Sequence, residues 1–136
     1  MVSTFTIKPV YSAFFTSGRI IVANKTFVIL GNQLFKPSVL KQLGCGHVFM
    51  AEDFGLCTYE RHHKLKIYLY LTSMREYKDE LRSHGIKVSY FCLEDREPLS
   101  NYISLLDDFI NKNELKEINC FEIEDRDFEK DFQKLF

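Results

Sequence analysis

The stretch EDFGLCTYERHHKLKIYLYLTSMREYKDELRSHG, residues 52–85, decides the fold of this chain. Its apolar side chains recur at the spacing of one helix face, at Ile67, Tyr70, Met74, Tyr77 and Leu81. Gly85 is well placed to end the helix in the left-handed conformation. We therefore expect an acidic loop that runs into one long helix.

The start of this helix carries an excess of positive charge. Thr58 is a candidate cap, and three cations follow it: Arg61, Lys64 and Lys66. The helix dipole favours negative charge at this end, so each cation costs a few tenths of a kcal/mol unless an anion or an acidic neighbour compensates it. We expect Glu52 and Asp53 to supply that compensation. The three cations are also candidate anion-binding residues.

Buried strands and amphipathic helices alternate on both sides of this stretch. Continuous apolar runs predict strands at 26–30, 47–51, 87–93 and 117–123, and periodic patterns predict helices at 37–43, 98–113 and 127–136. This alternation predicts a doubly wound, Rossmann-like α/β fold, a parallel sheet of about four strands with helices on both faces. Residues 26–136 would form this domain. Residues 1–25 would be an extension whose structure the sequence does not specify.

Composition narrows the class of protein. A chain of 136 residues is expected to form one domain, and its formal net charge of −1 argues against broad electrostatic capture of nucleic acid. The four cysteines form no CxxC pair, so free thiols in a reducing cytoplasm are expected. No apolar run approaches the roughly 18 residues of a membrane span. Adjacent histidines on a helix point about 100° apart, so His62 and His63 predict no metal site.

The fold class itself predicts where a ligand would bind. Doubly wound sheets bind ligands beyond the carboxyl ends of their strands, where the strand order reverses. Gly31, Asn32 and Gln33 follow the first predicted strand, and Glu52 and Asp53 follow the second. One glycine is too few for a dinucleotide fingerprint. The two amides either face a heterocycle edge or form an ordinary turn. No nucleophile–base pattern stands out, so catalysis by this chain has little independent support.

Several segments in order resemble a known family. They include FVILGNQLF at residues 27–35, the HHK-x-K run inside residues 52–85, and FEIEDRDFE at residues 121–129. Together these segments resemble the N-terminal domain of the deoxyribodipyrimidine photolyase-related proteins, the bacterial iron–sulfur cryptochrome and photolyase branch. Each segment alone is loose, but their order and spacing are specific. The resemblance covers nearly everything after residue 26.

The resemblance implies an antenna domain that holds a light-harvesting chromophore such as 6,7-dimethyl-8-ribityllumazine. FAD and an iron–sulfur cluster would belong to a separate C-terminal domain, outside this chain, that repairs damaged DNA under light or signals under blue light. The fifth strand usual in such a sheet would also be missing. Matched by position, the chromophore site would contain Leu30, Gly31, Asn32, Gln33, Leu34, Glu52, Asp53, Leu56, Tyr59, Ile67 and Tyr70.

Two residues depart from the family pattern. Asn32 stands where the family usually has Asp, which removes a charge but keeps an acceptor oxygen. Tyr70 is bulky where an aliphatic side chain would leave more room, so it is expected to narrow or close the pocket. The alternative function is a non-photochemical nucleotide-binding or protein-interaction module that uses the basic helix start. Self-association through a bare edge strand is expected as well.

Overall fold

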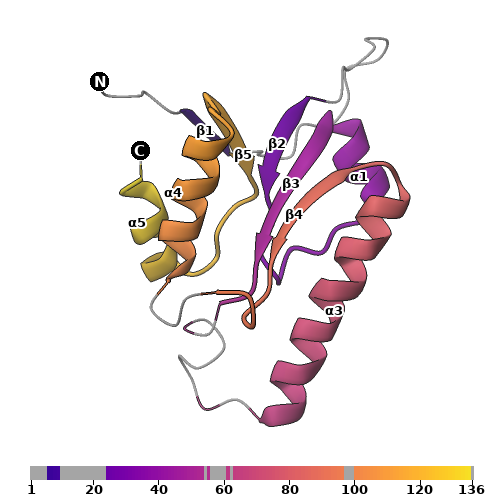
Figure 1. Ribbon diagram of the computed structural model, residues 1–136, viewed down its shortest axis with the longest axis vertical. Helices are drawn as coiled ribbons and strands as arrows, with labels where there is room; N and C mark the ends of the chain where they lie inside the picture. Colours follow the sequence, from indigo (N-terminus) through magenta and orange to yellow (C-terminus); the bar gives the residue numbers. More distant parts are fainter. Residues whose placement is uncertain are drawn as a thin grey trace.

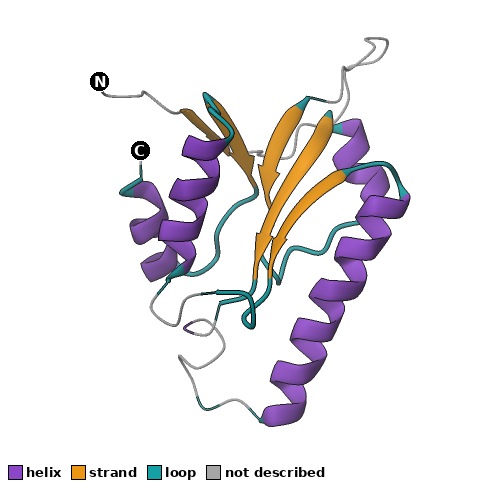
Figure 2. Cartoon of the chain, in the orientation of Figure 1, coloured by secondary structure: helices purple, strands orange, loops and turns teal. Residues whose placement is uncertain are grey.

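The chain forms a three-layer α/β structure with a parallel sheet in the middle (Figures 1 and 2). The computed structural model describes residues 6–9, 24–53, 55, 61, 63–96 and 100–135. Its strands are β1 (Thr6–Pro9), β2 (Lys25–Val28), β3 (Cys45–Ala51), β4 (Lys87–Phe91) and β5 (Glu117–Cys120). Its helices are α1 (Pro37–Gln42), α3 (Lys64–Ser83), α4 (Tyr102–Lys112) and α5 (Arg126–Gln133). The predicted doubly wound α/β fold is confirmed, and all four predicted strands are present.

The strand order is β1-β5-β2-β3-β4, and every paired strand is parallel to its neighbour. From β2 the chain proceeds outward through β3 to β4, then crosses to the other side of β2 to form β5. The order therefore reverses between β2 and β5, which pair at Phe27 with Asn119 and at Val28 with Cys120. This reversal is the topological switch point at which doubly wound sheets bind ligands.

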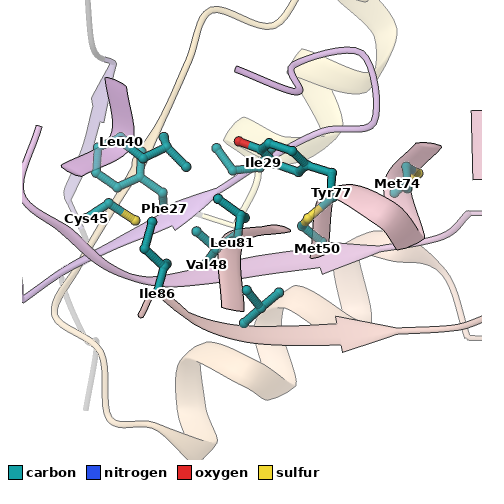
Figure 3. Close-up of a cluster of buried hydrophobic side chains, with 11 residues drawn as sticks. Phe27, Ile29, Leu40, Cys45, Val48, Met50, Met74, Tyr77, Leu81 and Ile86 are labelled. Atoms are coloured by element: carbon teal, nitrogen blue, oxygen red, sulfur yellow. The ribbon is translucent and has the colours of Figure 1, made fainter. Parts of the chain in front are cut away.

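Two apolar clusters hold the layers together, one on each face of the sheet. On the first face, Met74, Tyr77 and Leu81 of α3 pack with alternate side chains of β2 and β3 (Figure 3). On the second face, Phe49 and Tyr102 belong to a cluster shared by β3, α4 and α5. Both faces of the strands are thus covered, which explains why the strands are continuous apolar runs in the sequence.

Helix α3 ends as predicted but begins later than expected. Gly85 has a φ of 79°, and the N–H of Ile86 donates to the Leu81 carbonyl over 3.1 Å, which closes the helix in a left-handed turn. At the other end, Nδ1 of His63 accepts from the Leu65 N–H at 3.2 Å and acts as the N-cap. Thr58, the predicted cap, lies outside the described residues.

The last two helices also begin where a polar side chain caps them. The predicted helix from residue 98 begins at Tyr102, because the Asn101 side chain accepts from the Ser104 N–H at 2.8 Å. Helix α5 begins at Arg126 after Asp125, whose carboxylate accepts from two N–H groups of the first turn. Short polar caps therefore fix boundaries that periodicity alone places a few residues away.

The sheet gains a fifth strand from the N-terminal segment. Residues 6–9 form β1, which runs parallel to β5 with Thr6 opposite Glu117 and Pro9 opposite Cys120. The sequence does not specify the structure of residues 1–25, and the structure shows a strand at these four positions. The fifth strand expected to be missing is supplied by β1, and the outer strands of the described sheet are β1 and β4. Self-association through an edge strand stays a prediction. The segments 10–15 and 19–23, whose sequences are also compatible with short strands, lie outside the described residues.

Helix α3 extends past the carboxyl ends of the strands (Figure 1). Its buried residues, Met74, Tyr77 and Leu81, all lie in its second half. In its first two turns Leu65, Tyr68 and Leu69 are 69%, 70% and 66% exposed. The packed half of the helix belongs to the core, whereas its first half stands beside the ends of the strands. Among the described helices, none has the length and apolar character that crossing a membrane requires.

Candidate functional site

The carboxyl end of β3 leads into a buried carboxylate with four hydrogen-bond donors. Glu52 has no exposed surface. Its Oε1 accepts from Nε of Arg75 at 2.7 Å and from the Tyr90 hydroxyl at 2.7 Å. Its Oε2 accepts from Nη2 of Arg75 at 3.0 Å and from the Leu93 N–H at 3.1 Å. Glu52 thus ties β3 to α3, to β4 and to the loop that follows β4.

The charge of Glu52 is stabilised by these partners. Burial raises the pKa of the Glu52 carboxyl, but hydrogen bonds from Arg75, Tyr90 and Leu93 outweigh burial, and the net pKa lies below the ordinary value. The same bond to Glu52 raises the pKa of Arg75, and a second bond to Glu94 adds to it. Burial first, and then the bond to Glu52, raises the pKa of Tyr90. Glu52 is therefore an anion held in a fixed place.

This arrangement corrects the role expected for Glu52. Its carboxylate compensates Arg75 in the middle of α3 and not the cations at the start of the helix. Asp53 accepts from the Gly55 N–H at 3.0 Å, so it shapes the loop after β3. Within the described part of the chain, Arg61, Lys64 and Lys66 have no carboxylate partner, and the first turn of α3 holds no acidic residue.

The same corner contains three groups that could ligate a metal, from Glu52, Cys92 and Glu94. The Arg75 guanidinium lies among them, because its Nη2 donates to Glu52 and also to both Glu94 oxygens at 3.0 Å. The cation of this cluster is thus an arginine side chain. Burial raises the pKa of the Cys92 thiol and nearby carboxylates raise it further, which disfavours the thiolate that a metal needs.

The other described cysteines behave as core residues. Cys45, Cys92 and Cys120 are free thiols, as predicted for them. Burial raises the pKa of Cys45 to about 12 and that of Cys120 to about 11, so both stay protonated at neutral pH. They pack on opposite faces of the sheet as small apolar side chains. Cys57 lies outside the described residues.

The turn after β2 is in tight contact with α3. A Cβ atom built on Gly31 would overlap the Tyr70 ring and would lie 2.8 Å from Sδ of Met74. Glycine is thus required here by the close approach of a side chain. The tyrosine ring fills the space above Gly31, as expected from its bulk.

Tyr102 approaches the strand ends from the other face of the sheet. Burial is the main cause that raises the pKa of this tyrosine, and the nearby groups of Tyr70 and Asp53 raise it further. Its hydroxyl is buried and has no hydrogen-bond partner among the described residues. A tyrosine from each side of the sheet and one carboxylate are therefore close enough to interact electrostatically near the carboxyl ends of β2 and β3.

A hollow opens at the switch point, on the other side of the β2 turn. Gln33 is 6% exposed; its Nε2 donates to the Glu122 carbonyl at 2.8 Å, and its Oε1 accepts from the Leu30 N–H at 3.3 Å. This side chain ties the turn after β2 to the segment after β5. The hollow has a volume of about 240 Å³ and is lined by Asn32, Gln33, Phe35, Phe121, Glu122 and Glu124. Its two phenylalanine rings lie 4.6 Å apart, centre to centre.

Comparison with known proteins identifies the family. The family model for the deoxyribodipyrimidine photo-lyase-related proteins matches residues 27–136, from β2 through α5. The chain belongs to this family. No curated protein sequence matches the chain. The resemblance deduced from three sequence segments is therefore confirmed for the family as a whole.

In this photo-lyase-related chain the predicted site residues do not all share one place. Gly31 and Tyr70 are in contact, and Tyr70 and Asp53 each act electrostatically on Tyr102. Leu30 packs with the α4 and α5 face, whereas Leu34 packs with the α3 face. Ile67 is half-buried on α3. Leu56 and Tyr59 lie outside the described residues.

The turn residues Asn32 and Gln33 have different surroundings in this family member. Gln33 satisfies backbone groups, as in an ordinary turn, while Asn32 is exposed and lines the hollow. Sequence analysis missed the aromatic wall formed by Phe35 and Phe121. The strand order was the signal that could have revealed it: in the doubly wound order the fourth predicted strand neighbours the first, so residues after 120 meet those after 30.

Proposed function

We propose that this chain is an antenna-type α/β domain that binds a ribityllumazine-like chromophore over the carboxyl ends of β2 and β3. The observation that carries the proposal is that Tyr70 lies over Gly31, while Tyr70 and Asp53 both act electrostatically on the buried Tyr102, in a domain of the photo-lyase-related family. The buried Tyr102 hydroxyl, which has no hydrogen-bond partner among the described residues, offers a hydrogen bond to a ring that occupies the space over Gly31.

In a full-length protein such a chromophore would pass absorbed light energy to FAD. That flavin and an iron–sulfur cluster would lie in a C-terminal domain outside this sequence, and they would serve light-driven repair of DNA or blue-light signalling. The proposal assigns this chain the binding and orientation of the chromophore, and it assigns no catalytic residue. A cytoplasmic location agrees with the free thiols of the described cysteines.

Tyr70 sets the room that remains for the ring. Its side chain lies over Gly31, so a ring that binds there either stacks on the tyrosine or displaces it. Replacement by isoleucine would remove the aromatic ring and would enlarge the site. We expect Tyr70→Ile to bind ribityllumazine about tenfold more tightly than the wild type.

The test is a titration of 6,7-dimethyl-8-ribityllumazine with purified protein, followed by the fluorescence anisotropy of the ligand. Wild type should bind at micromolar concentration, Asp53→Ala should bind more weakly, and the exposed-site control Lys112→Gln should match the wild type. If neither the wild type nor Tyr70→Ile binds at micromolar concentration, the antenna proposal is refuted.

A second candidate function is a non-photochemical module that binds a phosphate or a partner's carboxylate at the start of α3. The observation that favours it is three exposed cations, Arg61, Lys64 and Lys66, beside a helix end without an acidic residue. Replacement of all three by glutamine should abolish such binding, and it should reduce lumazine binding only modestly. Titration of both ligands with the triple variant separates the two functions.

A further inference from the structure

Strand β4 is an outer strand of the described sheet and lies next to α3 (Figure 1). Its pairing with β3 shows which of its backbone groups face inward, because the Glu52 N–H donates to the Phe91 carbonyl at 2.9 Å. The backbone groups of successive strand residues point to opposite sides, so Ser89 also faces β3, whereas Val88 and Tyr90 face outward. Strand β4 therefore presents an outer row of two N–H and two C=O groups.

Most of this outer row lacks a partner in the described part of the chain. Nη2 of Arg82 donates to the Val88 carbonyl at 3.1 Å. The described residues form no hydrogen bond with the Val88 N–H or with the outward backbone groups of Tyr90. Unpaired backbone groups at a sheet edge are a template to which another extended chain can add. Arg82 covers one of the four groups, and its exposed side chain can move aside.

Two cations of α3 lie over the outer row, on the face of the sheet that α3 covers. Nζ of Lys78 lies 5.3 Å from the centre of the Tyr90 ring, and Arg82 reaches the Val88 carbonyl. Arg82 has no carboxylate partner among the described residues. Lys78 pairs with the exposed carboxylate of its neighbour Asp79 at 3.3 Å, and such a surface pair contributes little. This face of the edge is therefore positively charged.

The opposite face of β4 is apolar and incompletely covered. The Phe91 ring packs against Phe49 with a centre-to-centre distance of 5.4 Å, yet Phe91 is only half-buried. Ser89 is half-buried on the same face. Helices α4 and α5 lie toward the β5 side of the sheet (Figure 1). A strand added to β4 would thus meet cations on one face and part of a phenylalanine ring on the other.

We propose that the outer edge of β4 is a docking site for an extended acidic segment of a partner protein, which adds to the sheet as a further strand. The segment's backbone bonds to Val88 and Tyr90, as in other complexes in which a peptide extends a sheet. Its side chains alternate, with carboxylates on the α3 face and apolar groups on the face of Phe91. An N–H of the segment replaces Arg82 at the Val88 carbonyl, and Arg82 turns to a carboxylate of the segment.

The charges at this edge favour an acidic segment over a second copy of the chain. Two copies paired through β4 would bring a second Lys78 and a second Arg82 to the same face, where like charges oppose pairing. An acidic segment instead gains pairs of opposite charge between neighbouring strands. The same two cations thus disfavour one partner and attract the other, which is how binding surfaces achieve specificity.

This docking site is separate from the proposed chromophore site. Tyr70 lies over Gly31 at the turn after β2, and β3 separates β2 from β4 in the sheet. Neither site contributes a residue to the other. Docking at β4 can therefore be present whether or not a chromophore binds.

The test is a titration of a fluorescein-labelled seven-residue peptide of alternating valine and aspartate with the purified chain, followed by fluorescence anisotropy. Wild type should bind this peptide at sub-millimolar concentration and should not bind the same peptide with lysine in place of aspartate. Arg82→Gln should weaken binding about fivefold, and Lys78→Gln about twofold because Asp79 already pairs with Lys78. Both side chains lie on the helix surface, so both variants should fold.

Controls separate strand addition from simple attraction between charges. Lys112→Gln removes an exposed cation on α4 and should bind the acidic peptide like the wild type. A peptide methylated at every backbone nitrogen keeps its carboxylates but loses its donors, and it should not bind. Equal binding of the methylated peptide would overturn strand addition. Tighter binding by Arg82→Gln would mean that Arg82 only shields the edge, which would overturn its role in docking.

Two further outcomes would overturn the docking site as a whole. The first is the absence of binding by the wild type at millimolar peptide. The second is a wild-type dimer in sedimentation velocity without any peptide binding, which would assign the edge to a second copy. Tyr70→Ile changes the chromophore site alone and should leave peptide binding unchanged, so failure of one proposal does not decide the other.

Discussion

Acidic residues follow β3 and β5 in the same way along the sequence, but their surroundings are opposite. Glu52 after β3 is fully buried and accepts four hydrogen bonds, whereas Glu122 and Glu124 after β5 are exposed and line an open hollow. The difference comes from the neighbouring elements. The long helix α3 brings Arg75 to the end of β3, whereas Glu122 and Glu124 form no ion pair with the described cations. One strand end is closed by the protein itself, and the other is open.

Loss of the Glu52 carboxylate should produce the largest change in stability. Glu52→Ala leaves the Tyr90 hydroxyl and the Leu93 N–H without their partner and removes the anion beside Arg75. We expect a loss of about 3 kcal/mol in the free energy of unfolding, at the lower end for a broken buried pair because Arg75 is partly exposed and keeps Glu94. Urea unfolding of Glu52→Ala and of the exposed control Glu122→Ala measures this. Equal losses in both would contradict the contrast between the two strand ends.

Loss of the Gln33 side chain should cause the second-largest loss of stability, because Gln33 connects the turn after β2 to the segment after β5. Gln33→Leu leaves the Leu30 N–H and the Glu122 carbonyl without a partner. Leaving such groups unpaired costs about 1–3 kcal/mol, and we expect about 2 kcal/mol in urea unfolding. The neighbour Asn32 is exposed, so Asn32→Ser should change stability by less than about 0.5 kcal/mol. A large effect of Asn32→Ser with none from Gln33→Leu would reverse the roles given to the two amides.

Gly31→Ala tests how tightly the turn after β2 packs against α3. In Gly31→Ala the new Cβ meets the Tyr70 ring, and the side chain must shift. Overpacking of this kind typically costs about 1–3 kcal/mol of stability. We expect a loss of about 1 kcal/mol here, because the side chain of the half-buried Tyr70 has room to move. A double-mutant cycle with Tyr70→Leu should recover part of this loss, since the clash with the ring disappears while the close approach to Sδ of Met74 remains. Additive effects of the two substitutions would mean that the ring does not lie over Gly31.

The smallest expected effect is a pH dependence from His47. Burial lowers the pKa of His47, and the nearby Lys87 lowers it further, so the unfolded chain takes up the proton first as pH falls below the ordinary value of 6.5. Stability should therefore decline as the pH drops below 6.5. His47→Gln should remove this part of the decline while it keeps a polar partner for Ser89, which lies 2.8 Å from the imidazole Nε2. Urea midpoints at pH 7.5, 6 and 5 for both proteins measure the difference.

At still lower pH the Glu52 carboxylate should determine how stability changes with pH. The lowered pKa of Glu52 stabilises the folded state above the ordinary value of 4.5, and this contribution is lost as pH falls from there through the folded pKa. Glu52→Gln should lack that acid transition. If its acid unfolding matched that of the wild type, the carboxylate would not be the charged partner of Arg75.

Strands β2, β3, β4 and β5 were predictable from the sequence because helices cover both faces of the sheet and these strands therefore read as apolar runs. The end of α3 at Gly85 was predictable as well, because a left-handed residue favours glycine. Tyr70 was expected to narrow the site from its size alone. These features depend on local chemistry, which a single sequence contains.

The partners of the charged residues were not predictable in the same way. Glu52 precedes a run of cations in the sequence, but its partner is Arg75. This arginine lies further along α3, about two turns after Ile67, and the fold places it beside Glu52. The aromatic hollow joins Phe35 to Phe121, residues far apart in the chain that only the strand order brings together. Strand β1 escaped prediction because four residues at a sheet edge carry little pattern of their own.

The pairing of β1 with β5 has a consequence for how the protein is made. Strand β1 leaves the ribosome long before its partner β5, which begins at Glu117. Until then β1 has no place in the sheet, while β2, β3 and β4 can already assemble with α3. Edge pairing would therefore be the closing step of folding, and a nascent chain that stalls before residue 117 would present an unpaired strand to other chains.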